Sequence, residues 1–439
     1  MDIAINIARG LLGVTTMVMI AWLFSRNRKA INWRLVIIGL GLQLSIAALL
    51  LLKIPYVDDF FMGIAEGFVT IVGYAEAGSA FVFNSLGTAE PEKGSLGFFF
   101  AFQVLPIIIF FSALTSGLYY LGVLQRIVKA FAWIMARTMR LSGAESISAA
   151  GNVFLGQTEA PLLVKPYIEG MTRSELMCLM TGGMATIAGS VMAAYIKMMG
   201  GTTDMALNLL TASLMNAPAA IVVAKILIPE ENPDAINTDL SVSSEKIGAN
   251  FIDAIANGTS QGLQLALNVG AMLIAFVALI YMVNGLFGWV GEITNLNTII
   301  KETTKIAAAD GSTVSAFDGL SLEYLVGQLF RPLAFAIGIE WKDTLLVGSF
   351  LGTKVIVNEF IAYSSLSGTE AGVISERSRI ISAFALCGFA NFSSIAIQIA
   401  GIGGIAPNQR VTLSKLGLLA VLGGTLASMM SASVAGIFL

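Results

Sequence analysis

The chain has 439 residues, of which 56% are hydrophobic and only 12% are charged, and its mean hydropathy is +0.81. Soluble domains carry roughly 25% charged residues, so this composition excludes a soluble protein and predicts a polytopic membrane protein. The formal net charge of −3 gives no electrostatic footprint for nucleic acid, and the lack of histidine excludes His-ligated metals, Ser-His triads and histidine proton relays.

The first apolar run, about Ile7 to Phe24, is predicted to be a retained membrane span. No basic region precedes it and no small-residue cleavage site is evident, so it does not resemble a signal peptide. The loop after it is cationic, and the positive-inside bias places it in the cytoplasm, with Arg26, Arg28, Lys29 and Arg34. The N-terminus is therefore predicted to lie outside, and Leu35 to Leu52 is predicted to return the chain to the exterior.

An acidic segment follows the second span and is predicted to be external. Its charged residues are Asp58, Asp59, Glu66, Glu76, Glu90 and Glu92 against Lys93. Within it, Phe60 to Phe83 is apolar but rich in glycine and acid, which predicts an interfacial helix rather than a span. The third span, about Leu96 to Leu118, re-enters the cytoplasm. Gln125 to Arg140 then alternates basic and apolar residues, which predicts an amphipathic helix on the inner bilayer surface, either a simple anchor or an arm around moving parts.

The apolar segment Gly151 to Val164 is interrupted by the polar run Gly156 to Pro161. Its glycine and proline disfavour a continuous helix, and each arm has only about ten residues where a full span needs about 20. We therefore predict two short helices that enter from the cytoplasmic side and meet at a polar tip carrying Gln157, Thr158 and Glu159. Such backbone is tolerated in a membrane only when it is buried in protein or lines a wet cavity.

Two spans are predicted after this tip, Leu176 to Met198 and Met205 to Ile228. Pro229 to Asn250 is polar and is predicted to be a cytoplasmic loop, although Glu230, Glu231, Pro233, Asp234 and Asp239 make it acidic. Phe251 to Gln264 is predicted to be a surface helix that leads into the sixth span, about Leu265 to Val290. Glu292 to Asp318 is the most soluble-looking segment and is predicted to be external.

The same design recurs in Leu345 to Leu366, where Asn358 and Glu359 form a second polar tip, entered from outside. The seventh span, Ile380 to Ile402, carries the run Gly388 to Ser394, and the eighth, Leu416 to about Leu439, ends outside. Each tip is followed by two spans, and the hairpins open in opposite directions. Inverted repeats with broken helices are typical of secondary transporters. We predict an all-α fold of eight transmembrane helices plus two re-entrant hairpins of opposite orientation.

Glu159 and Glu359 are the strongest candidates for a functional site, because acids at membrane depth face a cavity, an ion or a partner. Gln157 offers a donor and an acceptor that suit the edge of a nucleobase or an amide. Asn391 and Ser394 are three residues apart on a helix and share one face. Free carbonyl groups at the helix breaks are hard ligands for a small cation such as sodium.

Other polar residues also have purely structural interpretations. Ser394 and Thr186 on their own are more often packing residues that bond their own helix backbone. Phe389 offers an aromatic surface for stacking or simply fills the core, and Gln157 alone could cap a broken helix. Lys225 and Lys354 are expected to snorkel or to pair, and an ion pair between Lys354 and Glu359 at the second tip is one of the alternatives.

Three stretches together resemble the concentrative nucleoside transporter family: Gly156 to Leu162, Asn358 to Tyr363 and Cys387 to Phe392. The resemblance covers essentially the whole chain in order and spacing. It is to the shorter bacterial members, which lack the three extra N-terminal spans of animal members. It implies a homotrimer in the bacterial inner membrane, with both termini of each protomer on the external side.

The resemblance also implies an elevator mechanism. The first three spans and the sixth would form a fixed scaffold, and the hairpins with spans four, five, seven and eight would form a moving transport domain. The implied ranges are 1–120 for the first scaffold spans and the interfacial helix, 121–142 for the amphipathic helix, 143–228 for the first half of the transport domain, 229–330 for the cytoplasmic loop, span six and the external loop, and 331–439 for the second half.

Carried over residue by residue, the resemblance implies a two-ended substrate site. Gln157, Thr158 and Glu159 would meet the nucleobase, the last two partly through water, and Val191 would line the base pocket. The ribose hydroxyls would be bound by Glu359, Asn391 and Ser394, with Phe389 beside the sugar.

The resemblance implies a sodium site between the first tip and the fourth span. Several ligands would be backbone carbonyls, from the set Asn152, Leu155, Thr158, Thr186 and Ile187. The family pattern leads us to expect serine at position 186, and threonine keeps its hydroxyl. Some bacterial relatives are driven by protons, but the intact Gln157 to Pro161 run with Asn152 favours sodium.

The sequence therefore predicts a secondary active symporter, not an enzyme, that imports nucleosides such as uridine on the sodium gradient. The alternatives are proton-coupled nucleoside symport and transport of another small polar metabolite, such as an amino acid or a dicarboxylate. Two acidic tips argue against anionic substrates. An ion channel or a membrane-embedded enzyme is a different class, and an enzyme would need a partnered nucleophile or a metal cage, neither of which the sequence offers.

Overall fold

The structure is a computed structural model that describes residues 3–89, 94–231, 248–307 and 313–439. Within these residues the regular structure is helical apart from one short antiparallel pair, β1 (Lys305–Ala307) and β2 (Thr313–Ser315). By length and composition, 8 helical segments in the described ranges could cross a membrane. The predicted class, an all-α polytopic membrane protein, is confirmed.

The first two predicted spans are α1 (Ile3–Leu23) and α2 (Trp33–Leu51). The third is α5 (Leu105–Tyr120), preceded by the single turn α4 (Phe100–Gln103). The predicted amphipathic helix is α6 (Val123–Met139), which buries Leu124, Val128, Ala132, Met135 and Met139 and leaves Ile127, Trp133 and Ile134 exposed. The fifth and eighth spans are α11 (Thr203–Leu227) and α19 (Arg410–Phe438).

The 8 apolar segments are not the same set as the predicted spans. α3 (Val57–Phe83) is one continuous helix of 27 residues and is long and apolar enough to count, although the sequence predicted an interfacial helix there. The predicted seventh span does not count, since it is divided into α17 (Glu376–Leu386) and α18 (Phe392–Ile405), and α18 is too short to cross alone, whereas the divided fourth span still counts as one segment. The surface position of α3 remains a prediction, since composition alone does not place a helix in the bilayer.

The helix that contains the predicted sixth span extends well beyond it. α12 (Phe251–Ile293) runs without a break for 43 residues, so no helix end separates the predicted surface helix from the span at Gln264, and the point where the span begins remains a prediction. Gly258 and Gly262 lie within it, and they serve packing rather than a break. A Cβ at Gly262 would lie 2.8 Å from the Cα of Ile109, so its absence lets α5 approach closely.

The predicted external segment Glu292 to Asp318 contains α13 (Leu296–Thr303) and the strand pair. It is followed by α14 (Leu322–Ala336), which the sequence analysis did not anticipate and which packs along α15 (Thr344–Ile356). Some predictions lie outside the described residues, namely those for Glu90, Glu92 and Lys93 and, in the predicted cytoplasmic loop, for Pro233, Asp234 and Asp239.

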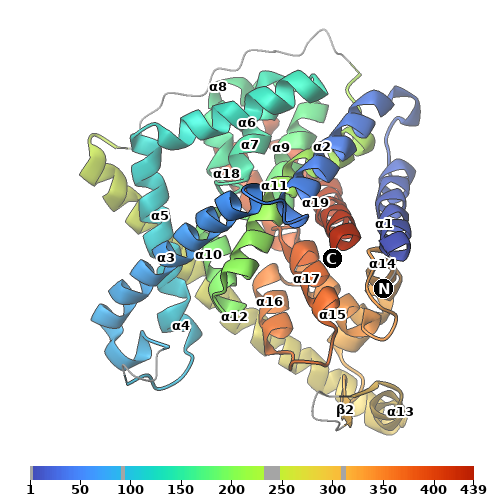
Figure 1. The fold of residues 1–439 in the computed structure, drawn as a ribbon. Helices are drawn as coiled ribbons and strands as arrows, with labels where there is room; N and C mark the ends of the chain where they lie inside the picture. The colour runs from blue at the N-terminus through green and yellow to red at the C-terminus, as the bar shows by residue number, and fades with distance from the viewer. Residues whose placement is uncertain (1–2, 90–93, 232–247, 308–312) are drawn as a thin grey trace.

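The helices pack in two groups (Figure 1). In the central group α1 packs against α19, and α2 packs against both α11 and α19. Side-chain hydrogen bonds join the same helices, because Asn6 donates to the Leu439 carbonyl at 2.9 Å and Gln43 donates to the Ser431 hydroxyl at 2.8 Å. In the outer group, α5 packs chiefly along α12 and also against α3.

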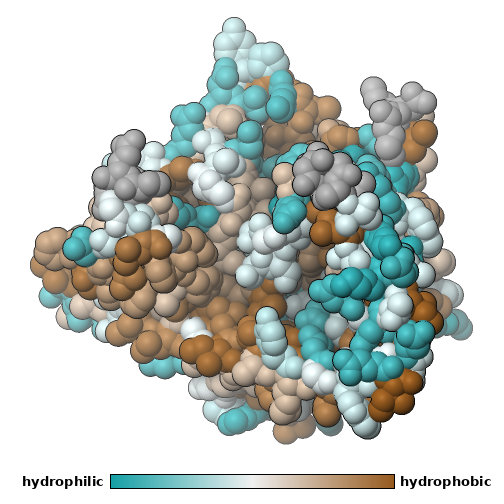
Figure 2. Space-filling model, turned by 90° about the horizontal axis from the view of Figure 1, so that it is seen from below, coloured by the Kyte–Doolittle hydropathy of each residue, from teal (hydrophilic) through white to brown (hydrophobic). Residues whose placement is uncertain are grey.

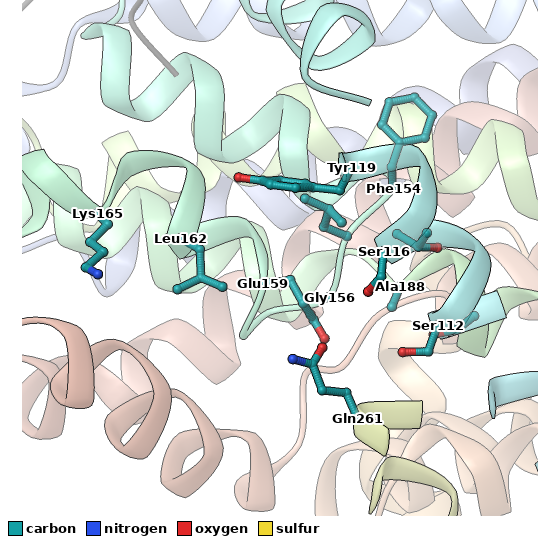
Figure 3. Close-up of a pocket in the computed structure, with 13 residues that line it drawn as sticks. Ser112, Ser116, Tyr119, Phe154, Gly156, Glu159, Leu162, Lys165, Ala188 and Gln261 are labelled. Atoms are coloured by element: carbon teal, nitrogen blue, oxygen red, sulfur yellow. The ribbon is translucent and has the colours of Figure 1, made fainter. Parts of the chain in front are cut away.

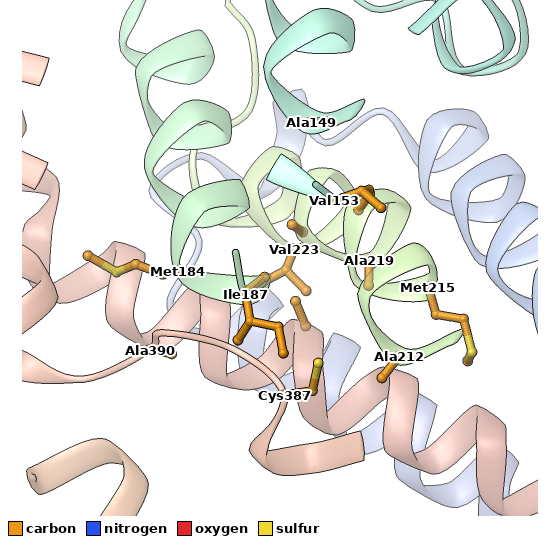
Figure 4. Close-up of a cluster of buried hydrophobic side chains, with 14 of the residues drawn as sticks. Ala149, Val153, Met184, Ile187, Ala212, Met215, Ala219, Val223, Cys387 and Ala390 are labelled. Carbon is orange, nitrogen blue, oxygen red and sulfur yellow. The ribbon is translucent and has the colours of Figure 1, made fainter. Parts of the chain in front are cut away.

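The core lies around α11 at the middle of the central group. Figure 4 shows Val153, Ile187, Met215 and Cys387 converging there from different elements. In α11, 89% of the most apolar stretch of the helix is buried inside the protein, whereas only 17% of that stretch is buried in α3 and in α12. The outer helices therefore present apolar side chains outward, among them Phe81 of α3 and Ile274 of α12, and Figure 2 shows broad hydrophobic areas on the surface.

Candidate functional site

The first polar tip lies between α7 (Gly143–Asn152) and a tight return arm. α7 starts with a capping box between Ser142 and Glu145, and residues 153–159 are irregular. The return arm is the 3₁₀ helix η4 (Ala160–Val164) followed by the single turn α8 (Lys165–Ile168), rather than the second short α-helix that we predicted. Pro166 explains the difference, since a continuous α-helical arm would need a backbone donor at that position, whereas Pro161 lies in the first turn and is tolerated there.

Gly156 leaves space for the side chain of Glu159. A Cβ at position 156 would lie 2.2 Å from Oε2 of Glu159, so with a larger residue the Glu159 carboxylate would have to leave its position over the tip backbone. The tip is also fixed to the neighbouring helix pair, because the Gly189 N–H donates to the Phe154 carbonyl at 3.1 Å.

The second polar tip is a much shorter interruption. α15 ends at Ile356, and α16 (Glu359–Gly368) begins after only two residues. The side chain of Asn358 caps α16 by accepting from the Ile361 N–H at 3.0 Å. Figure 1 shows the two hairpins near opposite ends of the central group, with α7 and α8 above and α15 and α16 below.

Two broken spans meet the tips. The predicted fourth span is divided into α9 (Arg173–Ala185) and α10 (Gly189–Met198), and the seventh is divided between α17 and α18. The backbones of the two breaks touch, because the Phe389 N–H donates to the Thr186 carbonyl at 3.4 Å. Asn216 of α11 also joins them, since its Nδ2 donates to the carbonyls of Ala185 and Cys387, both at 2.7 Å.

The structure brings together the residues predicted to bind ribose. Oε2 of Glu359 accepts from Nδ2 of Asn391 at 2.9 Å, and Oδ1 of Asn391 accepts from the Ser394 N–H at 2.9 Å. Nε2 of Gln157, from the other tip, donates to the Ser394 hydroxyl at 3.2 Å. All four side chains are buried, so polar groups from both hairpins and from α18 form one connected set.

Tyr195 belongs to this set, although the sequence analysis missed it. Its hydroxyl donates to Oε1 of Glu359 at 3.0 Å, and its ring stacks on Tyr363 with centroids 4.3 Å apart. The available signal was its position four residues after Val191, which places both on one face of a helix. Asn216 was missed as well, and its signal was a lone amide in the middle of an apolar span.

The residues predicted to bind the nucleobase make fewer hydrogen bonds than those predicted to bind the ribose. Oε1 of Gln157 and Oε2 of Glu159 are buried without a hydrogen-bond partner among the described residues. Val191 is buried on α10 and Phe389 lies half-buried in the second break, while the methyl group of Thr158 lies close to Gly401 of α18. Glu159 also lines a cavity of about 350 Å³ between the first hairpin and α5 (Figure 3).

The residues predicted to bind sodium come from the first hairpin and from the break between α9 and α10. The hydrogen bond from the Gly189 N–H to the Phe154 carbonyl joins these two elements. Asn152 ends α7 and Leu155 lies in the tip, while Thr186 and Ile187 lie in the first break. Both side-chain atoms of Asn152 are buried and have no hydrogen-bond partner in the described ranges. Thr186 donates its hydroxyl hydrogen to the Gly182 carbonyl at 2.8 Å, which leaves its oxygen lone pairs free to coordinate. The arrangement therefore fits a small cation held by neutral oxygens.

The two membrane lysines differ in their partners. Lys225 pairs with Glu145 at 2.5 Å, which ties the base of the first hairpin to α11. Lys354 donates to the Ala385 carbonyl and to the Ser428 hydroxyl, both at 2.8 Å. Within the described part of the chain it forms no ion pair with Glu359, so the suggested pairing at the second tip is wrong. Backbone and hydroxyl acceptors satisfy this lysine instead.

Comparison with known proteins identifies the family. The profile described as "Na+ dependent nucleoside transporter C-terminus" matches residues 208–436, the corresponding N-terminus profile matches 12–86, and one described as "Nucleoside recognition" matches 101–202. The chain belongs to the Na+-dependent nucleoside transporter family. It is therefore a membrane transporter rather than an enzyme, and the family's coupling ion is sodium.

Full-length relatives agree with this membership. An uncharacterized transporter of Haemophilus influenzae is 42% identical, with 99% of this chain and 98% of that protein covered. The nucleoside permease NupC of Helicobacter pylori is 38% identical, with 97% and 96% covered. The solved structure of CNTnw in an inward-facing substrate-bound state is 39% identical, covers 98% of this chain and 99% of that chain, and superimposes with a TM-score of 0.86.

Proposed function

We propose that this protein imports nucleosides by symport with sodium through alternating access. The observation that carries the proposal is the connected polar set of Gln157, Ser394, Asn391 and Glu359, which joins both hairpins in the middle of the fold. These groups bond to one another in this structure, and a nucleoside offers hydroxyl, carbonyl and amide groups that can replace those bonds one for one. Family membership supports the same substrate and ion.

In this proposal the two ends of the substrate have separate binding groups. Glu359 and Asn391 with Ser394 bind the ribose hydroxyls, with Phe389 beside the sugar. Gln157, Thr158 and Glu159 bind the nucleobase beside Val191, and the unpaired oxygens of Gln157 and Glu159 supply acceptors there. Sodium binds where Asn152, Leu155 and Thr158 of the first hairpin meet Thr186 and Ile187 of the first break.

The two packing groups suggest which parts move. We assign the hairpins with α9, α10, α11, α17, α18 and α19 to the moving transport domain, and α5 and α12 to the scaffold. α1 and α2 belong to the scaffold in this assignment, as the family resemblance implies, and they pack on α19 and α11. The interface that slides then includes these contacts, those of α3 with α11 and those of α10 with α3 and α5.

We further propose a homotrimer in the bacterial inner membrane with both termini external. The exposed apolar side chains of α12, including Leu267, Ile274 and Leu286, require either lipid or another copy of the chain. Light scattering of the detergent-solubilised protein, corrected for bound detergent, tests the trimer, and a mass other than three protomers contradicts it.

Uridine uptake into proteoliposomes tests the transport proposal. An inward sodium gradient is compared with equimolar choline at fixed pH. We expect uridine to accumulate with sodium only, because sodium and nucleoside bind adjacent sites and each favours the same closed state. Equal uptake in sodium and choline contradicts sodium coupling, and repeating the assay with an inward proton gradient then separates proton coupling from a wrong substrate.

A further inference from the structure

The cavity beside the first hairpin has two walls from different packing groups. One wall is the hairpin tip with Gly156 and Glu159, and the other is formed by α5 and α12. In Figure 3 the side chains of Glu159 and Gln261 point toward each other across the space, with Ser116 beside them. The volume of about 350 Å³ lies within the range of small-molecule sites, roughly 300–1,000 Å³.

The α5 wall is polar in a helix that is otherwise apolar. The residues of α5 that line the cavity all carry a hydroxyl, and they are Ser112, Thr115, Ser116 and Tyr119. Their spacing of three, one and three residues places them on one face of the helix. Close packing against Gly258 and Gly262 explains the small size of Ser112 and Ser116. Packing does not explain a hydroxyl at Thr115 or an amide at Gln261.

Three polar side chains of this wall are available to a solute. Thr211 and Ser433, on other membrane helices, donate to a carbonyl four residues earlier in the chain. Among the described residues Thr115, Ser116 and Gln261 make no such bond, and Gln261 is exposed. On the hairpin side, Oε2 of Glu159 is buried without a hydrogen-bond partner in the described ranges, and an unmet buried polar atom is costly. The cavity therefore offers polar groups to water or to a polar solute.

We propose that Gln261 and the hydroxyl face of α5 form a second, transient site for the nucleobase on its way out of the binding site. The inference rests on the proposed function, since it takes the passing solute to be a nucleoside. Gln261 resembles Gln157 in offering one donor and one acceptor to the edge of a base. Glu159 lines the cavity from the hairpin side, so the base exchanges bonds at Glu159 for bonds at Gln261 without first becoming fully hydrated.

The amide of Gln261 favours the base over the sugar, because it presents a donor and an acceptor in one plane, as the edge of a base does. Thr115, Ser116 and Gln261 are neutral, and the charged groups that line the cavity, Glu159 and Lys165, lie on the hairpin side. The carboxylate that binds ribose, Glu359, is not among the residues that line this cavity. In this proposal the rate of release depends on which base the nucleoside carries. The affinity of the main site depends on the groups that bind the ribose.

Kinetics of Gln261→Leu in proteoliposomes test this proposal. Removing the amide slows release after the substrate has been carried inward, so kcat and KM for uridine uptake should fall together, each by about five-fold, the factor that one neutral hydrogen bond supplies. Uridine affinity at saturating sodium, measured by calorimetry on the purified protein, should stay within about two-fold of wild type, because the main site is intact. Gln261→Asn, which keeps an amide, should recover part of the rate.

Gln264→Leu is the matched control, since Gln264 lies on the same helix, bonds to Asn268 and does not line the cavity. The slowing should be equal for uridine and 2′-deoxyuridine, which share a base, and should change for adenosine. Wild-type kcat and KM in Gln261→Leu, or a fall in kcat with KM unchanged, would overturn the exit site. Absence of wild-type uptake under both ion gradients would instead refute the proposed function.

Discussion

In the second hairpin both carboxylate oxygens of Glu359 accept hydrogen bonds, from Tyr195 and from Asn391, and the break is only two residues long. In the first hairpin seven residues are irregular, Oε2 of Glu159 has no partner among the described residues, and neither has the amide of Asn152. An acid in an apolar hairpin is thus used in two ways. The second hairpin has a closed tip, in which the carboxylate of Glu359 is held in place by its hydrogen bonds. The first hairpin has an open tip, in which side-chain oxygens remain available for an ion, a base and water.

Glu359→Gln should have the largest effect, because it removes the one charged acceptor of the closed tip. A hydrogen bond to a charged group contributes roughly 1.5–3 kcal/mol, so uridine affinity should fall by about 10- to 100-fold. Binding is measured by calorimetry at saturating sodium. Glu370→Gln, at an exposed position after α16, is the control, and wild-type affinity in Glu359→Gln would remove Glu359 from the ribose site.

Thr186→Ala tests the ion at the open tip. The half-saturating sodium concentration for uridine uptake should rise by about ten-fold, because a hydroxyl ligand is lost, whereas uridine affinity at saturating sodium should change little. Thr211→Ala removes a buried hydroxyl with the same type of backbone bond from α11, outside the proposed ligand set, and serves as the control. Unchanged sodium dependence in Thr186→Ala would place the ion elsewhere.

Glu159→Gln should have a moderate effect that depends on the base. The loss of a contact that is partly mediated by water costs less binding free energy than the loss of a direct one. Uridine affinity should therefore fall by about five-fold, and adenosine affinity by a different factor. Competition by unlabelled nucleosides during uptake measures both. Glu169→Gln, exposed at the base of the same hairpin, should behave as wild type. An equal loss for every base would mean that Glu159 acts on the hairpin fold and not on the base.

Tyr195→Phe should have the smallest effect. It tests how far the closed tip depends on Glu359 accepting two hydrogen bonds rather than one. Glu359 keeps its bond from Asn391, so affinity should fall by only about three-fold. The control is Tyr363→Phe, since its hydroxyl donates to the Ala383 carbonyl at 2.7 Å instead. If calorimetry shows a loss as large as that of Glu359→Gln, then Tyr195 is essential to the acceptor and is not a secondary support.

Much of the fold could be predicted because hydropathy and the breakers glycine and proline act locally. The two polar tips followed from such signals, whereas the convergence of Glu359, Asn391 and Ser394 was implied only by the family resemblance. The break at Thr186 was missed, because it lies inside a predicted continuous span. The continuity of α12 and the existence of α14 were missed as well, because a glycine that relieves crowding between two helices looks the same in a sequence as one that ends a helix.

Contacts between segments far apart in the chain were the hardest features to predict from the sequence. The sequence contains Asn216 as a lone amide and Gln261 as one more polar residue before a span, with no mark of what faces them. The packing of α1 on α19 joins opposite ends of the chain, so local periodicity gives no indication of it. These features depend on which faces meet, and only the assembled fold defines that.

The side-chain nitrogen of Asn216 fixes the separation of the two broken spans. Its two hydrogens have a rigid planar geometry, so neither break can slide along the other without losing a bond that is 2.7 Å long. In the proposed mechanism the substrate-binding groups on one break and the ion ligands on the other therefore move together. The two hydrogen bonds of Asn216 then keep one ion site beside one substrate site throughout the transport cycle.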